Sequence, residues 1–385
     1  MRLSMVSAAL VAALVGYGST IALVLAAAQA VGASPVQTAS WVAALCFGKA
    51  IGSLLLSTWT RIPVVLAWST PGAAIIAASA GVNINEAVGA FIFAGALIAF
   101  TGLLAPVHRA VSAIPAGIAS GMLAGVLLPF CISVAELAVT DTQWAMPLIA
   151  IFLVVRLYNP LFAVLLAFAG GITMAFALTD IGLLDVKMAS QPLVFIAPAF
   201  SMPVLIGLGV PLYLVTMASQ NLPGFAVLRA NGYQPPVARA LGVSGLGSAI
   251  VALFGAHTFN MAAITAAICV GDDVHPDKKE RWKIAIAYAV IWVGLGILGP
   301  LIIPTMLALP KAVIATVAGL ALVMPMVGAA GAAFEAEKTR FAAAATFIVT
   351  ASGIAAFGIG AAFWGLMAGL LIHAIDPIRH VLARR

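Results

Sequence analysis

Two ionisable side chains lie inside long apolar stretches of this 385-residue chain. Lys49 belongs to the stretch Cys46–Gly52, and His257 belongs to Gly255–Phe259. An ionisable group at membrane depth is costly and is by default a functional candidate, and an imidazole exchanges protons near neutral pH. Lys49 and His257 are therefore candidates for carrying a proton. The structural alternatives are a lysine stem that reaches the membrane surface and a histidine that bonds a free carbonyl.

The stretch Ser69-Thr70-Pro71-Gly72 predicts the start of a short helix. Thr70 precedes a proline, which disfavours the α conformation, so it is expected to cap a helix whose first residue is Pro71. The residues before it, 62–68, are rich in β-branched side chains and are expected to be extended. The helix is predicted to end near Ala80, after about ten residues or roughly 15 Å.

Residues 255–271 have the same form. Asn260 is the predicted cap, and Met261–Val270 is predicted to be a second half-length helix. A helix that starts inside a membrane points unpaired N–H groups at a cavity, which suits an anion. Two such starts predict a mid-membrane site for an anionic substrate. The alternative is a pair of proline- and glycine-kinked helices that only pack.

Further polar and aromatic side chains are expected beside these breaks. Buried amides and hydroxyls need partners, which are either neighbouring helices or a substrate. The predicted substrate-binding residues are Tyr17, Ser19, Thr20, Trp68, Ser69, Thr70, Gly72, Gln220, Asn221, Asn260, Met261 and Ala262. The aromatic rings in this set favour an aromatic ligand over sulfate.

Two other chemistries are weakly suggested. Gly242-Val243-Ser244-Gly245 matches the short nucleophile pattern of intramembrane serine proteases, but four residues in a glycine-rich chain match by chance. The loop Asp272–Asp277 carries metal-ligand residue types, yet neighbouring lysines and arginines balance its charge. The three cysteines show no metal spacing, and neither a metal nor a cofactor is expected.

The composition indicates the class of protein that positions these residues. The chain is 64% hydrophobic and 8% charged, whereas soluble domains are about 25% charged. A globule cannot be coated with so few charges, so an all-α polytopic membrane protein is predicted. The apolar runs fall near 5–32, 37–60, 62–81, 84–105, 116–137, 143–158 and 161–178, and then near 199–222, 237–255, 256–271, 283–308, 312–333, 341–359 and 361–377.

The charges agree with fourteen spans. With both termini cytoplasmic, fifteen of the eighteen lysines and arginines fall on the cytoplasmic side; Lys187 and Lys311 fall outside, and Lys49 lies within a span. This bias follows the positive-inside rule. Because the basic residues are spread over several loops, nucleic acid is not an expected partner.

Seven spans in each half predict an inverted repeat. The expected repeats are residues 1–180 and 195–385, separated by the polar stretch 179–191. Residues 14–20 align with 214–220, and Ile114-Pro115 corresponds to Leu309-Pro310. Gly117, Gly121 and Gly125, four apart, predict close packing against a neighbouring helix or a second subunit, so a homodimer is one expected arrangement.

The chain resembles the benzoate/proton symporter family, BenE, nearly from end to end. The resemblance rests on Ala67–Ala74, Leu214–Asn221, Ala262–Cys269, His275–Lys278 with Arg281-Trp282, and Phe363–Leu366. It implies the fourteen-span fold of uracil and sulfate/bicarbonate carriers, in which spans 1–4 and 8–11 form a core domain and spans 5–7 and 12–14 a gate domain. Spans 3 and 10 of that fold are each a short strand followed by a half-helix.

The resemblance also implies a function. A secondary transporter in a bacterial inner membrane is expected, taking up benzoate or a similar aromatic carboxylate with protons. The same fold carrying a nucleobase or an inorganic anion is the alternative. Proton-coupled relatives in the nucleobase branch have acidic residues in spans 8 and 10, whereas Gln220 and Asn260 are neutral here. His257 and Lys49 are the remaining proton-coupling candidates, and His373 is expected at the membrane surface.

Overall fold

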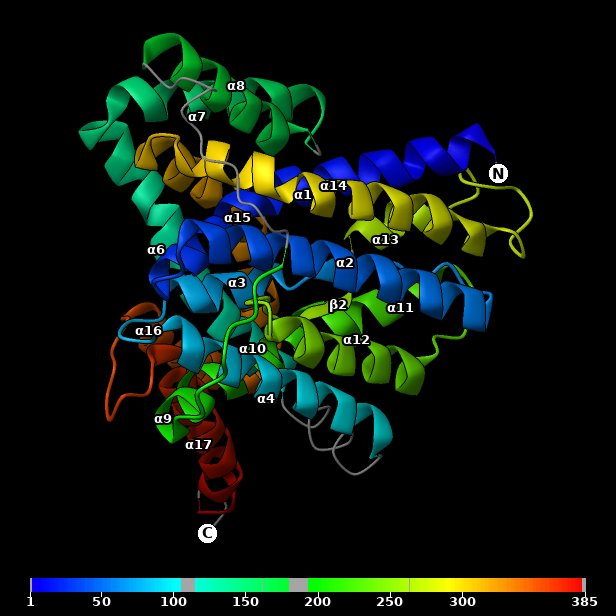
Figure 1. Cartoon of the computed structure of the whole chain (residues 1–385). Helices are drawn as coiled ribbons and strands as arrows, with labels where there is room; N and C mark the ends of the chain where they lie inside the picture. The colour runs from blue at the N-terminus through cyan, green and yellow to red at the C-terminus, as the bar shows by residue number, and fades with distance from the viewer. Residues whose placement is uncertain (1, 105–114, 161, 180–192, 263, 383–385) are drawn as a thin grey trace.

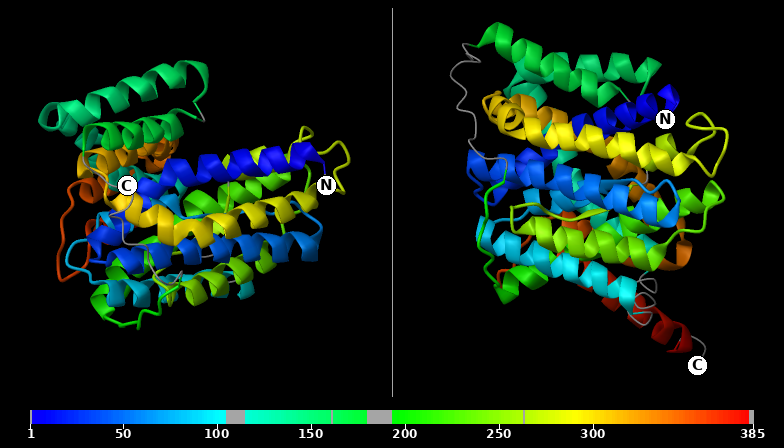
Figure 2. Two further views of the ribbon diagram at one scale, coloured as in Figure 1. Left: turned by 45° about the horizontal axis from the view of Figure 1, so that its top comes forward. Right: turned by 45° about the vertical axis from the view of Figure 1, so that its right-hand side comes forward.

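The protein is a bundle of membrane-length helices crossed at its centre by two short strands. The computed structural model describes residues 2–104, 115–160, 162–179, 193–262 and 264–382, with only the backbone for Ile264 and residues 376–382. Long helices run side by side, a helix pair lies at one edge, and the C-terminal helix leaves the opposite edge (Figure 1). Figure 2 shows the same parallel packing from two other directions.

The first half contains seven helices and one strand among the described residues. In order they are α1 (Leu3–Ala30), α2 (Pro35–Thr60), β1 (Leu66–Trp68), α3 (Thr70–Ala77), α4 (Ile84–Leu103), α6 (Ala116–Thr140), α7 (Thr142–Tyr158) and α8 (Ala163–Leu178), where α3 is the half-length helix. The predicted Ile114 and Lys187 positions, and most of the polar stretch 179–191, lie outside the described residues.

The second half begins with a long, irregular helical span. It comprises α9 (Met202–Val204), the π-helical η1 (Leu205–Gly209), α10 (Val210–Thr216), the π-helical η2 (Met217–Asn221) and α11 (Leu222–Ala230). The remaining elements are α12 (Val237–Ala252), β2 (Phe259–Met261), α13 (Ile264–Val270), η3 (Arg281–Lys283), α14 (Ile284–Leu307), α15 (Lys311–Glu335), η4 (Glu337–Thr339), α16 (Arg340–Ala351) and α17 (Ala361–Leu382).

The prediction of a polytopic helical membrane protein is confirmed. Seven described helical stretches are long and apolar enough to cross a membrane, and four shorter ones of 10–17 residues are also apolar. Two predicted limits were wrong: the eighth span continues beyond residue 222 to Ala230, and the thirteenth ends at Ala351 rather than near 359. The eighth span absorbs Pro211 and Pro223 as early residues of new helical segments, where a missing N–H is harmless.

The two breaks are present, but their local details differ from the prediction. Ser69, not Thr70, caps α3, because the Ser69 hydroxyl reaches the Gly72 N–H. The α3 helix ends at Ala77, three residues earlier than expected. Met261 belongs to β2, and α13 starts only at Ile264. The predicted cap at Asn260 was therefore wrong, because residues 259–261 pair with β1 instead of opening a helix.

The strands β1 and β2 lie side by side at the centre of the bundle as an antiparallel pair. Leu66 lies opposite Met261, Ala67 opposite Asn260, and Trp68 opposite Phe259. Backbone groups at membrane depth must find partners within the protein. The pairing supplies them on the inner edge of each strand, so the outer edges must be satisfied by other elements.

Serines on the flanking helices satisfy those outer edges. On α2, Ser53 accepts from Leu66 N–H at 2.9 Å. On α12, Ser248 accepts from Phe259 N–H at 3.0 Å and donates to the Phe259 carbonyl at 3.2 Å. From α14, the Tyr288 hydroxyl donates to the Leu66 carbonyl at 2.8 Å. Short hydroxyl side chains on helices therefore make an isolated strand pair tolerable inside the membrane.

The predicted glycine stripe packs inside the chain. A Cβ on Gly121 would lie 2.5 Å from the carbonyl of Ala343 on α16, and one on Gly125 would lie 2.7 Å from the carbonyl of Phe347. The absence of side chains thus lets α6 and α16 approach backbone to backbone. This stripe serves helix packing within one subunit.

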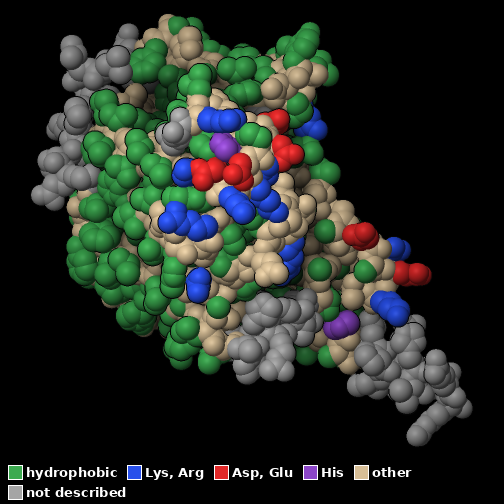
Figure 3. Space-filling view, turned by 90° about the vertical axis from the view of Figure 1, so that its right-hand side faces the viewer, with side chains coloured by type: hydrophobic (Ala, Val, Ile, Leu, Met, Phe, Trp, Pro, Cys, Tyr) green, Lys and Arg blue, Asp and Glu red, His purple; other side chains and the backbone are tan. Residues whose placement is uncertain are grey.

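Charged side chains gather on one end of the bundle, where hydrophobic side chains surround them (Figure 3). Arg61 lies over the ring of Trp282, and Arg239 lies over the ring of Trp59. Arg281, which is buried, donates at 3.0 Å to the carbonyl of Val270, the last residue of α13. The short helix α13 is therefore held at this end by a cation on its carbonyl terminus.

Candidate functional site

The start of α3 is a tightly built helix terminus beside the strand pair. Ser69 is buried, and its Oγ accepts from Gly72 N–H at 3.1 Å. A Cβ at position 72 would lie 2.7 Å from this oxygen and 2.6 Å from Leu212 Cδ1. The local sequence thus needs a hydroxyl at 69 and no side chain at 72 for the chain to turn from strand to helix here.

Hydroxyl groups from four elements meet at this terminus. Ser69 Oγ lies 2.9 Å from Thr216 Oγ1, which lies 3.1 Å from Thr258 Oγ1. On the other side, Thr70 Oγ1 lies 3.2 Å from Thr20 Oγ1 of α1. Ser19 Oγ is 3.4 Å from Thr20. Each hydroxyl both donates and accepts, so the cluster can reorient towards a ligand.

The π-helical segment η2 brings the predicted amides to the same centre. Asn221 is fully buried, and its Oδ1 accepts from Met261 N–H at 2.9 Å, which ties η2 to β2. Gln220 is half-buried. Its side-chain amide has no hydrogen-bond partner in the described part of the chain. Single π-helical turns often mark functional sites; here the widened turn leaves one amide engaged and one free.

The second break contributes backbone N–H and C=O groups and the side-chain amide of Asn260 to the same centre. Asn260 is buried, and its neighbours fix the orientation of its amide: with the amide nitrogen towards the Met261 carbonyl it donates there at 2.8 Å, and its oxygen then accepts from Ser69 N–H at 3.2 Å. Ala262 N–H donates to the Val65 carbonyl at 3.1 Å. These predicted residues therefore hold the two breaks together, and their polar groups are already occupied.

His257 lies behind the α3 start with both ring nitrogens engaged. Trp41 of α2 donates its indole N–H to His257 Nδ1 at 2.9 Å. A nitrogen that accepts carries no proton, so Nε2 carries the hydrogen and donates to the Ser69 carbonyl at 3.1 Å. The structure thus places His257 as a neutral imidazole that supports the residue capping α3.

Lys49 is fully buried among aromatic rings. Its Nζ lies 3.6 Å from the ring centroid of Trp68 on β1 and 2.9 Å from that of Trp292 on α14. In the described residues the ion pairs are Arg281–Asp272 and Lys283–Glu280. Lys49 therefore has no carboxylate partner, and the π-faces of two indoles are its contacts.

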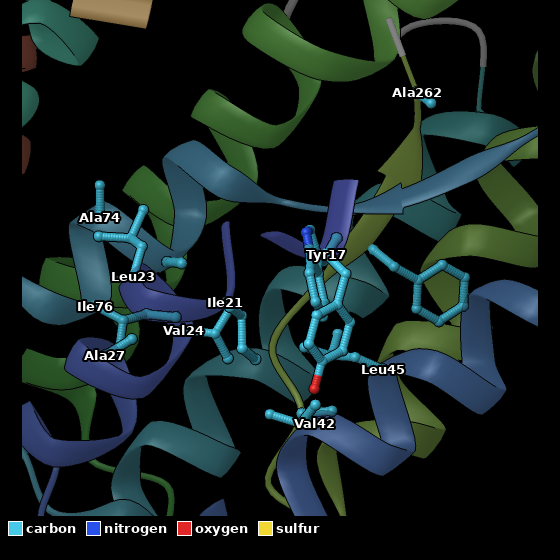
Figure 4. Close-up of a cluster of buried hydrophobic side chains, with 14 of the residues drawn as sticks. Tyr17, Ile21, Leu23, Val24, Ala27, Val42, Leu45, Ala74, Ile76 and Ala262 are labelled. Atoms are coloured by element: carbon cyan, nitrogen blue, oxygen red, sulfur yellow. The ribbon is translucent and has the colours of Figure 1, made fainter. Parts of the chain in front are cut away.

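Tyr17 packs against both indoles that contact Lys49. Its ring centroid lies 5.6 Å from that of Trp68 and 6.0 Å from that of Trp292, and the two indoles are 5.4 Å apart. Figure 4 shows the Tyr17 hydroxyl turned towards Val42 and Leu45 of α2. We call Tyr17, Lys49, Trp68 and Trp292 the Lys49 cluster.

The structure brings most of the predicted residues together. Contacts join α1, the α3 start, η2 and β2 through Thr20, Thr70, Ser69, Thr216 and Asn221. Sequence reasoning did not single out three residues: Trp41, Trp292 and Tyr288. The sequence did contain a signal for them. Tryptophan and tyrosine are enriched at membrane surfaces, whereas these three lie well inside apolar runs, where their polar groups need a partner. Among the described residues, no group of His, Cys, Asp and Glu side chains is arranged to hold a metal.

Comparison with known proteins assigns the family. The family profile described as "BenE: Benzoate membrane transport protein" matches residues 1–375. The chain belongs to the BenE family. Two relatives span nearly all of this BenE chain. The inner membrane protein YdcO of Escherichia coli (strain K12) is 38% identical over 371 residues, covering 96% of this chain and 94% of the relative. The benzoate membrane transport protein of Acinetobacter baylyi (strain ATCC 33305 / BD413 / ADP1) is 32% identical over 379 residues, covering 97% and 95%.

Solved structures share the fold of this BenE protein. The transmembrane domain of a cyanobacterial bicarbonate transporter, BicA, has a TM-score of 0.63 at 15% identity and covers 96% of this chain and 97% of its own. The murine anion transporter Slc26a9 in the inward-facing state has a TM-score of 0.67 at 11% identity, covering 100% and 69%. The BenE protein is therefore a membrane transporter, not an enzyme.

The protease alternative also fails on the geometry of this BenE protein. Ser244 is buried in α12, and its hydroxyl donates to the Leu241 carbonyl of its own helix at 3.5 Å. The ring nitrogens of His257 are engaged by Trp41 and Ser69. A serine nucleophile needs a base within hydrogen-bond reach, and His257 does not provide one.

Proposed function

We propose that this protein takes up benzoate or a similar aromatic carboxylate together with a proton. The observation that carries the proposal is Lys49: a fully buried amine with no carboxylate partner, held on two indole rings next to the α3 start. A buried ammonium is costly without a counter-charge. A substrate that brings a carboxylate and an aromatic ring matches both parts of this environment.

The substrate's place is proposed near the α3 start and the strand pair. The hydroxyls of Ser19, Thr20 and Thr70 and the free amide of Gln220 are the polar groups there that a ligand can engage. The relative from Acinetobacter baylyi is named for benzoate, and family membership supports a small organic anion. A nucleobase or an inorganic anion on the same fold is the alternative. The neutral Gln220 and Asn260 and the aromatic cluster favour the aromatic acid.

Proton coupling is proposed because the membrane potential opposes the entry of an anion into the cell, and a co-transported proton cancels the negative charge. The membrane potential opposes each inward negative charge by about 2.3 kcal/mol per 100 mV. Of the two candidates, Lys49 is favoured over His257, because both nitrogens of His257 are committed to Trp41 and Ser69. A neutral Lys49 amine would take up the proton, and the ammonium formed would pair with the carboxylate, so each ligand favours the other.

The test uses uptake of radiolabelled benzoate into proteoliposomes. Lys49→Gln and His257→Gln are compared for exchange between equal pools and for accumulation driven by a pH gradient. We expect Lys49→Gln to lose accumulation, whereas His257→Gln retains it in whatever protein folds. If accumulation survives Lys49→Gln but is lost in His257→Gln, His257 and not Lys49 carries the coupled proton. If the wild type transports no aromatic acid, the substrate assignment is wrong.

The architecture proposed is fourteen spans in a seven-plus-seven inverted repeat, residues 1–180 and 195–385, with core and gate domains. Seven long spans and four shorter apolar helices, with the two breaks and α16, account for fourteen segments. Ser53 on α2 and Ser248 on α12 serve β1 and β2 in the same way, as expected of related halves. Cytoplasmic termini in a bacterial inner membrane are part of this proposal, and the E. coli relative is named as an inner membrane protein.

A further inference from the structure

Two buried polar atoms in the Lys49 cluster find no hydrogen-bond partner in the part of the chain that the structure describes. They are the hydroxyl of Tyr17, a residue 7% exposed, and the indole N–H of Trp292, a residue 1% exposed. The hydroxyl of Thr265 on α13, beside Trp292 near Gly16, is also unpartnered. Most buried polar groups in proteins are paired, so each exception needs an explanation.

Polar groups of the same chemical types nearby do have hydrogen-bond partners. The indole N–H of Trp41 donates to His257 at 2.9 Å, and the hydroxyl of Tyr288 donates to the Leu66 carbonyl at 2.8 Å. Both residues are as buried as Tyr17 and Trp292. This part of the fold is therefore able to pair an indole and a phenol, and it does so for one of each type. Of the residues with unpaired groups, Trp292 contacts Lys49 directly, and Tyr17 packs against both indoles that contact it.

The unpaired groups and Lys49 share one chemical character. A tyrosine hydroxyl, an indole N–H and an ammonium are all donors, and an ionised carboxylate is acceptor-only with about four lone-pair positions. Among the described residues, no carboxylate reaches Lys49. The cluster thus offers donors from α1, α2 and α14, and within the described residues it has no anionic acceptor to match them.

We infer that Tyr17 and Trp292, with Lys49, are the residues that recognise the carboxylate of the substrate. This inference rests on the proposed function and adds α14, through Trp292, to the binding site. On binding, the Lys49 amine, which lies on the indole faces in the empty protein, takes up the proton as proposed above, and the ammonium formed pairs with the carboxylate. The rings of Trp68 and Trp292 then remain as apolar and aromatic contacts for the substrate's ring.

Tyr17→Phe removes only a hydroxyl, whereas Trp292→Phe removes the indole N–H together with part of the ring system and therefore needs a control with the same change in volume. Tyr17→Phe and Trp292→Phe are compared with matched controls, Tyr288→Phe and Trp41→Phe, whose donors are engaged inside the protein. Purified protein in detergent is titrated with benzoate by calorimetry, and the melting temperature of the ligand-free protein is measured in parallel. Benzamide, which lacks the ionised carboxylate, serves as the comparison ligand.

A donor that binds the substrate and a donor that is bonded within the protein should differ in how their removal changes the melting temperature and the benzoate affinity. Removing an unpaired buried donor does not destabilise the empty protein, so Tyr17→Phe should keep or raise its melting temperature. Trp292→Phe also loses buried ring volume, so its melting temperature should fall by less than that of Trp41→Phe, which loses the same volume and a hydrogen bond as well. Tyr17→Phe and Trp292→Phe should weaken benzoate binding by about 10- to 100-fold each, the loss of a hydrogen bond to a charged group. The benzamide affinity should change much less. The controls should lower the melting temperature because they leave His257 or the Leu66 carbonyl without a partner.

Unchanged benzoate affinity in both Tyr17→Phe and Trp292→Phe would overturn the inference. So would an equal loss for benzoate and benzamide, because the donors would then not read the carboxylate. If wild-type protein transports a different anion and ignores benzoate, the proposed substrate fails. The donor set is then judged by the same variants titrated with that anion.

Discussion

Ser248→Ala is expected to weaken the centre of the protein out of proportion to the size of the change. The Ser248 hydroxyl accepts from the N–H of Phe259 and donates to the carbonyl of the same residue, at 3.0 and 3.2 Å. Alanine removes one oxygen and leaves both backbone groups buried without partners. The opposite edge of β2 still pairs with β1, so the loss is confined to this edge.

The magnitude follows from the two groups left unpaired. Each unsatisfied buried donor or acceptor destabilises a protein by about 1–3 kcal/mol, so the two together should cost at least about 2 kcal/mol, or roughly 30-fold or more in the unfolding equilibrium. Benzoate affinity should fall as well, because Asn260 lies within β2 and Ala262 follows it directly. Loss of both stability and affinity is the expected signature of a strand that positions the site.

Ser244→Ala is the matched control. Ser244 lies one turn earlier on α12, is equally buried, and has only a 3.5 Å bond to the Leu241 carbonyl of its own helix. Unfolding in detergent, followed by intrinsic fluorescence, should show a change of only a few tenths of a kcal/mol. Equal losses in the Ser248→Ala and Ser244→Ala proteins would refute the reasoning, because any buried serine on α12 would then matter equally.

Three further predictions concern the site and the topology. Gln220→Leu should weaken benzoate binding by about 1–3 kcal/mol, the effect of losing one polar partner; an unchanged dissociation constant in calorimetry would remove Gln220 from the site. Gly72→Ala should abolish uptake into proteoliposomes, because its Cβ would lie 2.7 Å from the capping hydroxyl. Gly294→Ala, with no atom within 4 Å of its Cβ, should transport normally. Cysteines placed at Lys187 and Lys338 should react with impermeant reagents from opposite sides of the membrane, and labelling from one side would contradict fourteen spans.

The sequence was most informative where a local rule decides the structure. Pro71 and the β-branched residues before it indicated the first break, because a proline restricts its neighbour wherever it occurs. The cap was misplaced by one residue, since Ser69 and Thr70 both carry hydroxyls. Which of them caps α3 depends on which oxygen reaches the Gly72 N–H, and that is set by the strand that precedes it.

The pairing between the breaks was not predictable from local rules. Asn260 and Met261 have the residue types of a helix start, yet they lie in a strand because β1 offers its edge at that place. Similarly, the sequence identified Lys49 and His257 as unusual but did not distinguish their environments. His257 accepts from the indole N–H of Trp41, whereas the amine of Lys49 lies over the faces of two indoles. Both partners are remote in the chain, so only the fold could assign them.

The strand pair also has a consequence for the order in which the chain matures. Ser69 and His257, which bond across the crossing, are 188 residues apart. At a synthesis rate of roughly 5–20 residues per second, the second break follows the first by about 10–40 s. During that interval β1 is made and delivered to the membrane while its partner strand does not yet exist. The inner edge of β1 must therefore be kept solvated, or protected by the insertion machinery, until the second half arrives.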